Sequence, residues 1–270
     1  MKSNTAESPI EADEDAGIAR YEIRLGGDGD DDQHEETFEV KLEGELVEMR
    51  CHDYADIYAL PGLYEQLFRD ELECRSPVAV RDALSHALAQ RDADASSLRI
   101  LDVGAGNGMV AEELAKLGPE TIVGVDIIAA AAQAAWRDRP GLYGAYHVLD
   151  LTDMGEHAWS ELEDVGFNCM TTVAALGFAD IPPLAFANAY NLVSDGGWIA
   201  FNLKAEFLEG SDDTGFARLV RRMLNEDVLD LKIEERYRHR LSVAGDPLHY
   251  VALVGEKEGH VPLGWADDLH

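Results

Sequence analysis

Apolar residues follow two different periods along the chain. From residue 98 onward, short apolar runs typical of buried strands alternate with stretches in which apolar residues recur every three or four positions, as on one face of a helix. This alternation predicts a parallel sheet covered by helices on both faces. The predicted strands cover residues 98–103, 121–126, 146–150, 165–172, 198–202, 236–243 and 248–256, and the predicted helices cover 109–117, 129–137, 183–193 and 214–224.

The last two predicted strands differ from the others in their connection. Only Gly245, Asp246 and Pro247 stand at the turn between them. A turn this short joins antiparallel strands, whereas a parallel pair needs a much longer crossover. We therefore expect the α/β fold class, with a doubly wound, mostly parallel seven-stranded sheet that ends in a C-terminal antiparallel hairpin.

The first part of the chain shows other patterns. Residues 1–19 are polar and acidic, which predicts a disordered tail. Residues 21–25 and 38–42 alternate between apolar and polar positions on either side of a glycine- and aspartate-rich stretch, which predicts a β-hairpin extension. The aromatic-rich segment 52–72 is divided by Pro61-Gly62 into two short helical pieces.

A longer helix is predicted to follow this aromatic-rich segment. Serine is a common N-cap and proline a common first residue of a helix, which places the helix start at Ser76-Pro77. Val80, Leu84 and Leu88 then share one face. Residues 92–97 form a polar linker into the first strand of the predicted sheet.

The strand 98–103 leads into the next helix through Gly104, Gly106 and Gly108. Glycines let the backbone approach a ligand closely, and a helix N-terminus presents free N–H groups to an anionic group. The dinucleotide fingerprint requires a third small residue where this chain has Met109. The segment 102–108 instead has the pattern Asp-x-Gly-x-Gly-x-Gly.

This pattern resembles motif I of the class I S-adenosylmethionine (SAM)-dependent methyltransferases. Asp126, Asp150 and Asp195-Gly-Gly follow it in the family's order, and the resemblance covers about residues 50–256. The segment 54–64 resembles the entry segment of small-molecule members, and the segments 141–143 and 175–178 resemble bacterial small-molecule methyltransferases. We therefore expect a disordered acidic tail (1–19), an N-terminal extension with a helical lid (20–97), a SAM-binding Rossmann-like domain (98–256) and a C-terminal tail (257–270).

The resemblance also implies how SAM is held. Asp126 would accept hydrogen bonds from the ribose hydroxyls, with Ile127 packed on the adenine, and Asp150 would accept from the adenine amino group beside the Leu151 N–H. Asp102 and the glycine loop would face the methionine end, and the loop that begins at Thr172 would pass under the sulfur. The implied cofactor-binding residues are Asp102, Gly104, Ala105, Gly106, Asn107, Gly108, Asp126, Ile127, Asp150, Leu151 and Thr172.

Methyl transfer from SAM is an in-line displacement, so a dedicated base is needed only when the acceptor must lose a proton. The candidate catalytic residues near the expected pocket are Tyr58, Tyr64, Asn202 and Lys204, with Glu206 also nearby. His239 and His249 in the terminal hairpin are more often structural in such positions. No His, Cys or acidic cluster has metal-ligand spacing, so we expect no metal.

Composition narrows the partners. A net charge of −31 opposes binding to a nucleic-acid backbone and mildly favours neutral or cationic small molecules, or a basic partner. Three cysteines with no close pair fit a reducing cytoplasm. No run reaches the roughly 18 apolar residues of a membrane span, so we expect no membrane partner.

Two other functions stay open at this point. A nicotinamide-dependent dehydrogenase is opposed by Met109 and by the terminal hairpin. A noncatalytic SAM-binding or interaction protein is compatible with the lack of a clear catalytic residue. An open strand edge within residues 20–49 also permits a homodimer.

Overall fold

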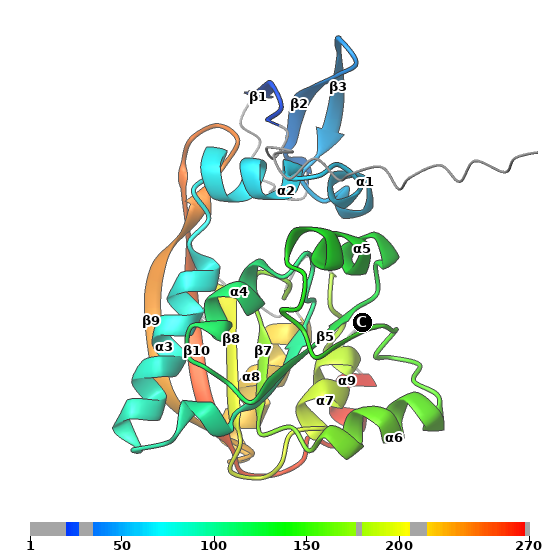
Figure 1. Cartoon of the computed structure of the whole chain (residues 1–270). Helices are drawn as coiled ribbons and strands as arrows, with labels where there is room; N and C mark the ends of the chain where they lie inside the picture. Colours follow the sequence, from blue (N-terminus) through cyan, green and yellow to red (C-terminus); the bar gives the residue numbers. More distant parts are fainter. Residues whose placement is uncertain (1–19, 27–34, 177–179, 206–214, 268–270) are drawn as a thin grey trace, which may run out of the picture.

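A computed structural model describes residues 20–26, 35–176, 180–205 and 215–267. The larger part is a seven-stranded sheet in the order β6-β5-β4-β7-β8-β10-β9 (Figure 1). Neighbours from β6 to β8 are parallel, and β10 is antiparallel to both β8 and β9. The predicted fold class is confirmed. The strands are β4 (Arg99–Val103), β5 (Thr121–Asp126), β6 (Ala145–Val148), β7 (Cys169–Thr172), β8 (Trp198–Lys204), β9 (Leu229–Leu241) and β10 (Pro247–Lys257).

Helices cover both faces of this sheet, because the strand residues that point to either face are apolar. In β4, Ile100 packs with α3 and α4, whereas Leu101 and Val103 pack into the opposite core with α6, α7 and α8. A strand buried on both faces is a near-continuous apolar run, as the sequence of β4 is. The helices are α3 (Ser76–Gln90), α4 (Met109–Ala115), α5 (Ala129–Asp138), α6 (Glu156–Val165), α7 (Pro183–Asn191), α8 (Gly215–Asn225) and α9 (Gly264–Asp267).

The direction of strand progression reverses at β4. From β4 the chain adds β5 and β6 on one side and then crosses to β7 and β8 on the other. In open α/β sheets, ligands bind at such a switch point, outside the carboxyl ends of the strands. The glycine loop follows the carboxyl end of β4, so the topology itself marks this edge as the place for a site.

The N-terminal part forms a second, smaller sheet with short helices beside it (Figure 1). Strands β1 (Ile23–Leu25) and β2 (Thr37–Leu42) pair as the predicted hairpin, and β3 (Glu45–Arg50) adds an unpredicted third strand after a turn at Glu43-Gly44. The aromatic-rich segment forms α1 (Tyr54–Ala59), α2 (Leu63–Glu65) and the π-helix η2 (Gln66–Glu71), divided at Pro61-Gly62 as expected. The predicted disordered tail, 1–19, lies outside the described residues.

Several predicted boundaries are wrong, each for a local reason. The strand predicted at 165–172 begins only at Cys169, because residues 156–165 form α6 and Gly166 ends that helix in the left-handed conformation. The strand predicted at 236–243 begins at Leu229, where its pairing with β10 starts. The prediction missed residues 229–235 because charged side chains on the outer face interrupt the apolar pattern. Val261 and Ala266 are buried in the main core, so the segment after β10 is not a separate tail.

The expected role of Ser76 as a helix cap is also wrong. Arg75 occupies the cap position, and the Ser76 side chain bonds Tyr237 and His239 on β9 instead. Helix α3 packs on the sheet and not on the lid, so the lid ends before residue 76. A short connection, η3 (Ala95–Ser97), then leads into β4.

The far end of β9 joins the N-terminal part to the main sheet (Figure 1). Arg240, 4% exposed, forms an ion pair with Glu36, 7% exposed, beside the start of β2. Glu36 also accepts a hydrogen bond from the Val243 N–H at 2.9 Å. No helix in the described part of the chain has the length and apolar character that a membrane crossing requires.

Replacing Arg240 with methionine should lower the free energy of unfolding by about 3–5 kcal/mol, because Glu36 would remain buried without its cation. Arg238→Met is the matched control: Arg238 lies on the same strand, and it and its partner Glu73 are 30% and 54% exposed. The control should change stability by about 0–1 kcal/mol. Urea unfolding of both variants measures the difference, and equal effects would contradict a structural role for the buried pair.

Candidate active site

The glycine loop between β4 and α4 is fixed by close contacts to Gly106. Its N–H donates to Asp126 Oδ2 at 2.9 Å, and its carbonyl accepts from the Tyr146 hydroxyl at 2.7 Å. A Cβ atom at Gly106 would lie 2.5 Å from the Tyr58 hydroxyl oxygen of the lid, and the residue has φ +54°. A side chain there would therefore collide with the lid, so the loop requires glycine for its space as well as its backbone conformation.

An open cleft lies along this edge of the sheet and contains about 820 Å³ of empty space, including solvent at its mouth. The lining comes from the carboxyl ends of β4, β5, β6 and β7 and from the lid helices. The residues are Tyr54, Tyr58, Tyr64, Val103, Gly104, Val125, Asp126, Ile127, Ile128, Leu149, Asp150, Leu151, Val173, Ala174, Ala175, Asp180, Ile181, Pro182 and Ala185.

Asp126 ends β5 at the wall of the cleft. Besides the Gly106 N–H, its carboxylate accepts from the Ile128 N–H at 2.8 Å, one hydrogen bond on each oxygen. A carboxylate offers about four acceptor positions, so each oxygen can accept one more donor. Burial raises the pKa of Asp126, and the backbone N–H groups oppose that rise. The next residue, Ile127, is 62% exposed and presents an apolar surface beside the carboxylate.

Asp150 follows β6 on the same edge and is exposed. Both hydrogen bonds that it accepts from Thr152, from the N–H at 2.8 Å and the hydroxyl at 2.6 Å, use Oδ1. These two donors lower the pKa of Asp150, so it is ionised at neutral pH. Leu151 also lines the cleft.

Asp102 does not line the cleft, although the sequence placed it at the methionine end. It is 1% exposed and accepts hydrogen bonds from the Tyr143 and Thr171 hydroxyls, each at 2.9 Å. Burial raises its pKa to about 6, and the two hydroxyls oppose the rise. Asp102 therefore ties β4 to β7 and to the segment before β6, beneath the loop.

Five other predicted residues do not line the cleft: Ala105, Gly106, Asn107, Gly108 and Thr172. The Asn107 side chain instead donates to Glu65 of the lid at 2.6 Å. Arg139 donates to the same Glu65 oxygen at 2.6 Å and to the Asn107 carbonyl at 3.1 Å. Only the fold brings these three segments together, so no sequence pattern indicated this attachment of the lid.

The candidate catalytic residues divide into two groups. Tyr58 and Tyr64 line the cleft, 4.8 Å apart between ring centroids, and burial raises the pKa of both hydroxyls. Asn202 is fully buried beneath it and accepts from the Ala174 N–H at 2.7 Å, so it holds the loop and cannot meet a ligand in the cleft. Lys204 lies outside the lining, and Glu206 lies outside the described residues.

Asp180 also lines the cleft, although sequence reasoning did not single it out. The sequence did offer a signal for it, because Asp180 stands just before Ile181-Pro182-Pro183, at the start of α7.

The backbone of Ala174, the residue held by Asn202, is strained. Its φ is +56°, an unfavourable conformation for alanine. Such strain is often concentrated at functional sites.

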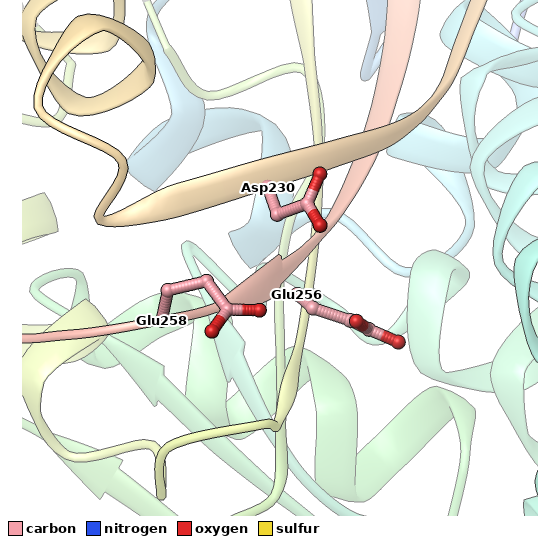
Figure 2. Close-up of side chains that lie close together, drawn as sticks. All are labelled: Asp230, Glu256 and Glu258. Atoms are coloured by element: carbon pink, nitrogen blue, oxygen red, sulfur yellow. The ribbon is translucent and has the colours of Figure 1, made fainter.

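One acidic group lies far from the cleft, where β9 begins and β10 ends. Asp230, Glu256 and Glu258 have carboxylate oxygens within 4.8 Å of one another (Figure 2). Lys232 pairs with Asp230 and lies 3.4 Å from Glu256, and Arg91 pairs with Glu256 at 2.7 Å. These side chains already supply positive charge, so the group has no need of a metal ion.

The family is decided by comparison with known proteins. A family model described as a methyltransferase domain matches residues 74–240, more than half of the chain. The chain belongs to this methyltransferase family. Together with the sheet order and the glycine motif, this makes the protein a class I SAM-dependent methyltransferase, and SAM is its methyl donor. A search of curated proteins finds no match.

Several solved structures are similar to this chain at low sequence identity. Magnesium protoporphyrin IX methyltransferase from Synechocystis PCC 6803, solved with bound SAM, is 14% identical over 66% of this chain and 78% of its own, with a TM-score of 0.45. An N-methyltransferase from Bradyrhizobium japonicum WM9 is 15% identical over 67% and 95%, with a TM-score of 0.44. A ribosomal protein L11 methylase from Lactobacillus delbrueckii subsp. bulgaricus is 17% identical over 66% and 79%, with a TM-score of 0.42. These similarities are too low to bear on the substrate.

Asp102 gives the methyltransferase a pH-dependent stability term. Its pKa is about 6 in the folded protein against an ordinary 3.8, so the folded state holds the proton more tightly and wild-type stability falls as pH rises from about 4 to about 6. The asparagine side chain of Asp102→Asn does not titrate. The free energy of unfolding of this variant, relative to wild type, should therefore rise by up to about 3 kcal/mol between pH 4 and pH 7. Urea unfolding across this pH range measures it, and a constant difference would refute the raised pKa.

Proposed function

We propose that this methyltransferase transfers the methyl group of SAM to a small-molecule acceptor inside the cleft at the carboxyl edge of β4, β5 and β6. The observation that carries the proposal is the roof of the cleft. Tyr54, Tyr58 and Tyr64 of the lid line it together with the strand ends, and Glu65 fixes the lid to the glycine loop. A site covered in this way favours an acceptor small enough to enter beneath the lid.

The residues at this edge fit the parts of SAM. The open acceptor positions of Asp126 match a ribose diol, and the exposed side chain of Ile127 offers an apolar surface for adenine. The Asp150 carboxylate suits the adenine amino group, and the glycine loop, which lines the cleft at Gly104, leaves room for the methionine end. The carboxylates around the cleft also suit a cationic sulfonium.

SAM supplies an electrophilic methyl group, and the protein's task is to position the acceptor in line with it. Proximity and orientation can contribute about 7–11 kcal/mol to such a reaction at the upper end. The Ala174 backbone, held from below by Asn202, and the Tyr64 ring form the wall where the two reactants would meet. Positioning the acceptor and forming this wall do not require a metal ion.

The charge of the protein supports a small acceptor over a nucleic acid. With a net charge of −31, the chain repels a phosphate backbone, and the carboxylates of Asp126, Asp150 and Asp180 line the cleft itself. A cytoplasmic location and a homodimer remain predictions. For the dimer, the open edge would be β3, where Leu46 and Val47 are 41% and 40% exposed.

Asp126→Ala should weaken the binding of S-adenosylhomocysteine by about 1–3 kcal/mol, because the ribose hydroxyls lose their buried acceptor and the glycine loop loses its anchor. Isothermal titration of the purified protein measures this loss. Asp153→Ala is the matched control, since Asp153 is an exposed acid next to the same edge that does not line the cleft. Unchanged affinity in Asp126→Ala, or tighter binding of NAD than of S-adenosylhomocysteine, would overturn the proposed site.

A further inference from the structure

A second cavity adjoins the cleft and contains about 530 Å³ of empty space, open solvent included. Tyr54, Tyr64, Ala174 and Asp180 line both cavities, so the two share a wall. The rest of the second cavity is closed by the lid and by the β9–β10 hairpin, and its lining includes His239. We call this space the hairpin cavity.

The orientation of His239 in the hairpin cavity is fixed on two sides. Its Nδ1 atom lies 2.6 Å from Ser76 Oγ and 3.9 Å from Cys74 Sγ. Its ring packs on the Tyr250 ring, with centroids 4.0 Å apart. Since His239 lines the cavity and its Nδ1 is engaged by Ser76, Nε2 is the ring nitrogen available to a ligand there.

Counting protons along the hydrogen-bond chain sets the tautomer. The Asn202 amide donates to both Ser76 Oγ and the Tyr237 hydroxyl, because its own oxygen is occupied by the Ala174 N–H. The Tyr237 hydroxyl, 2.6 Å from Ser76 Oγ, then donates to it, and the Ser76 hydroxyl donates to His239 Nδ1. In this arrangement every proton in the chain has an acceptor, and the ring proton of His239 is on Nε2.

Burial keeps His239 neutral, because it lowers the pKa of the imidazole well below its ordinary value and the adjacent Arg240 lowers it further. Nε2–H is therefore a neutral hydrogen-bond donor with no unshared pair to act as a base. The Arg240 guanidinium is paired with Glu36, so it adds no uncompensated positive charge for an anion. Aromatic rings make up much of the remaining wall, including Tyr54, Tyr64, Phe68 and Tyr250.

We propose that the hairpin cavity binds the methyl acceptor, that the acceptor is a planar ring compound with a carbonyl-type oxygen and no negative charge, and that His239 Nε2–H donates a hydrogen bond to that oxygen. This rests on the proposed function of the adjoining cleft. The flat rings pack against a flat ligand, and the shared wall at Ala174 places the acceptor next to the methyl donor site. Asn202 is then a positioning residue, because it holds both Ala174 and the chain that orients His239.

The first test reads the tautomer directly. Nitrogen-15 NMR of the histidine rings of the full-length protein, bound to S-adenosylhomocysteine, should show His239 with its proton on Nε2 and no titration between pH 6 and pH 8. A proton on Nδ1, or titration within this range, would overturn the donor role. His239→Phe assigns the resonance.

The second test uses acetophenone as a probe and ethylbenzene as its partner without the oxygen. With S-adenosylhomocysteine bound, acetophenone should shift the His239 Nε2 signal and bind at least about tenfold more tightly than ethylbenzene, a difference of about 1.4 kcal/mol. His239→Phe should abolish this preference and leave S-adenosylhomocysteine affinity unchanged. His249→Phe, an exposed histidine on β10, is the matched control and should leave the preference intact.

The outcomes separate the two proposals. If the wild-type protein did not bind S-adenosylhomocysteine, the proposed cleft would be refuted. Normal S-adenosylhomocysteine binding with no preference for acetophenone would refute the hairpin cavity proposal alone. Tighter binding of benzoate than of acetophenone would also refute it, because an anion would then be the favoured occupant.

Discussion

The site depends on the close approach of three elements to one backbone position, Gly106. The end of β5 reaches it through Asp126, β6 through the Tyr146 hydroxyl, and the lid through Tyr58. A side chain at Gly106 would not fit between the loop and the lid, so the loop is fixed by these contacts together with the Asn107 side chain, which donates to Glu65 of the lid. These contacts set the position of the cleft, because Asp126 at the strand end and Tyr58 of the lid both line the cleft and both contact Gly106.

Two carboxylates near this loop differ because their surroundings differ. Asp102 is fully enclosed and receives only two hydroxyl donors, so its pKa rises to about 6. Asp150 is exposed and receives its donors from the neighbouring residue Thr152, so its pKa falls. The first contributes to the connection between strands, and the second places an ionised carboxylate at the cleft edge. The same residue type therefore serves structure in one place and, in our proposal, recognition in another.

A buried polar chain connects the two cavities. Asn202 reaches Ala174 on one side and Ser76 and Tyr237 on the other, and Ser76 reaches His239. Removing any member would leave buried polar groups without partners, which is costly in a low-dielectric interior. The hydrogen bonds thus relate the backbone at the proposed donor site to the side chain at the proposed acceptor site.

The sequence by itself determined the class of fold and indicated the edge of the sheet where the SAM site is proposed. Strand and helix periods, the three glycines and the order of Asp126 and Asp150 are local patterns, and each records a backbone or burial requirement that is met within a few residues. The short turn at Gly245 likewise determined the antiparallel hairpin, because chain length alone excludes a parallel crossover. Helix α6 was missed because its face toward the core is narrow, with Leu162 as its one fully buried residue.

Only the tertiary structure decided what lies between segments distant in sequence. In the tertiary structure Asp102 lies outside the cleft, and Asn202 lies beneath it and accepts from the Ala174 N–H. Glu65, Asn107 and Arg139, which are distant in sequence, contact one another. The tertiary structure also placed Ser76 against His239, 163 residues further along the chain, where a cap was expected. These contacts form between segments that pack together across the sheet. The local period of one segment does not encode which distant side chain it will meet.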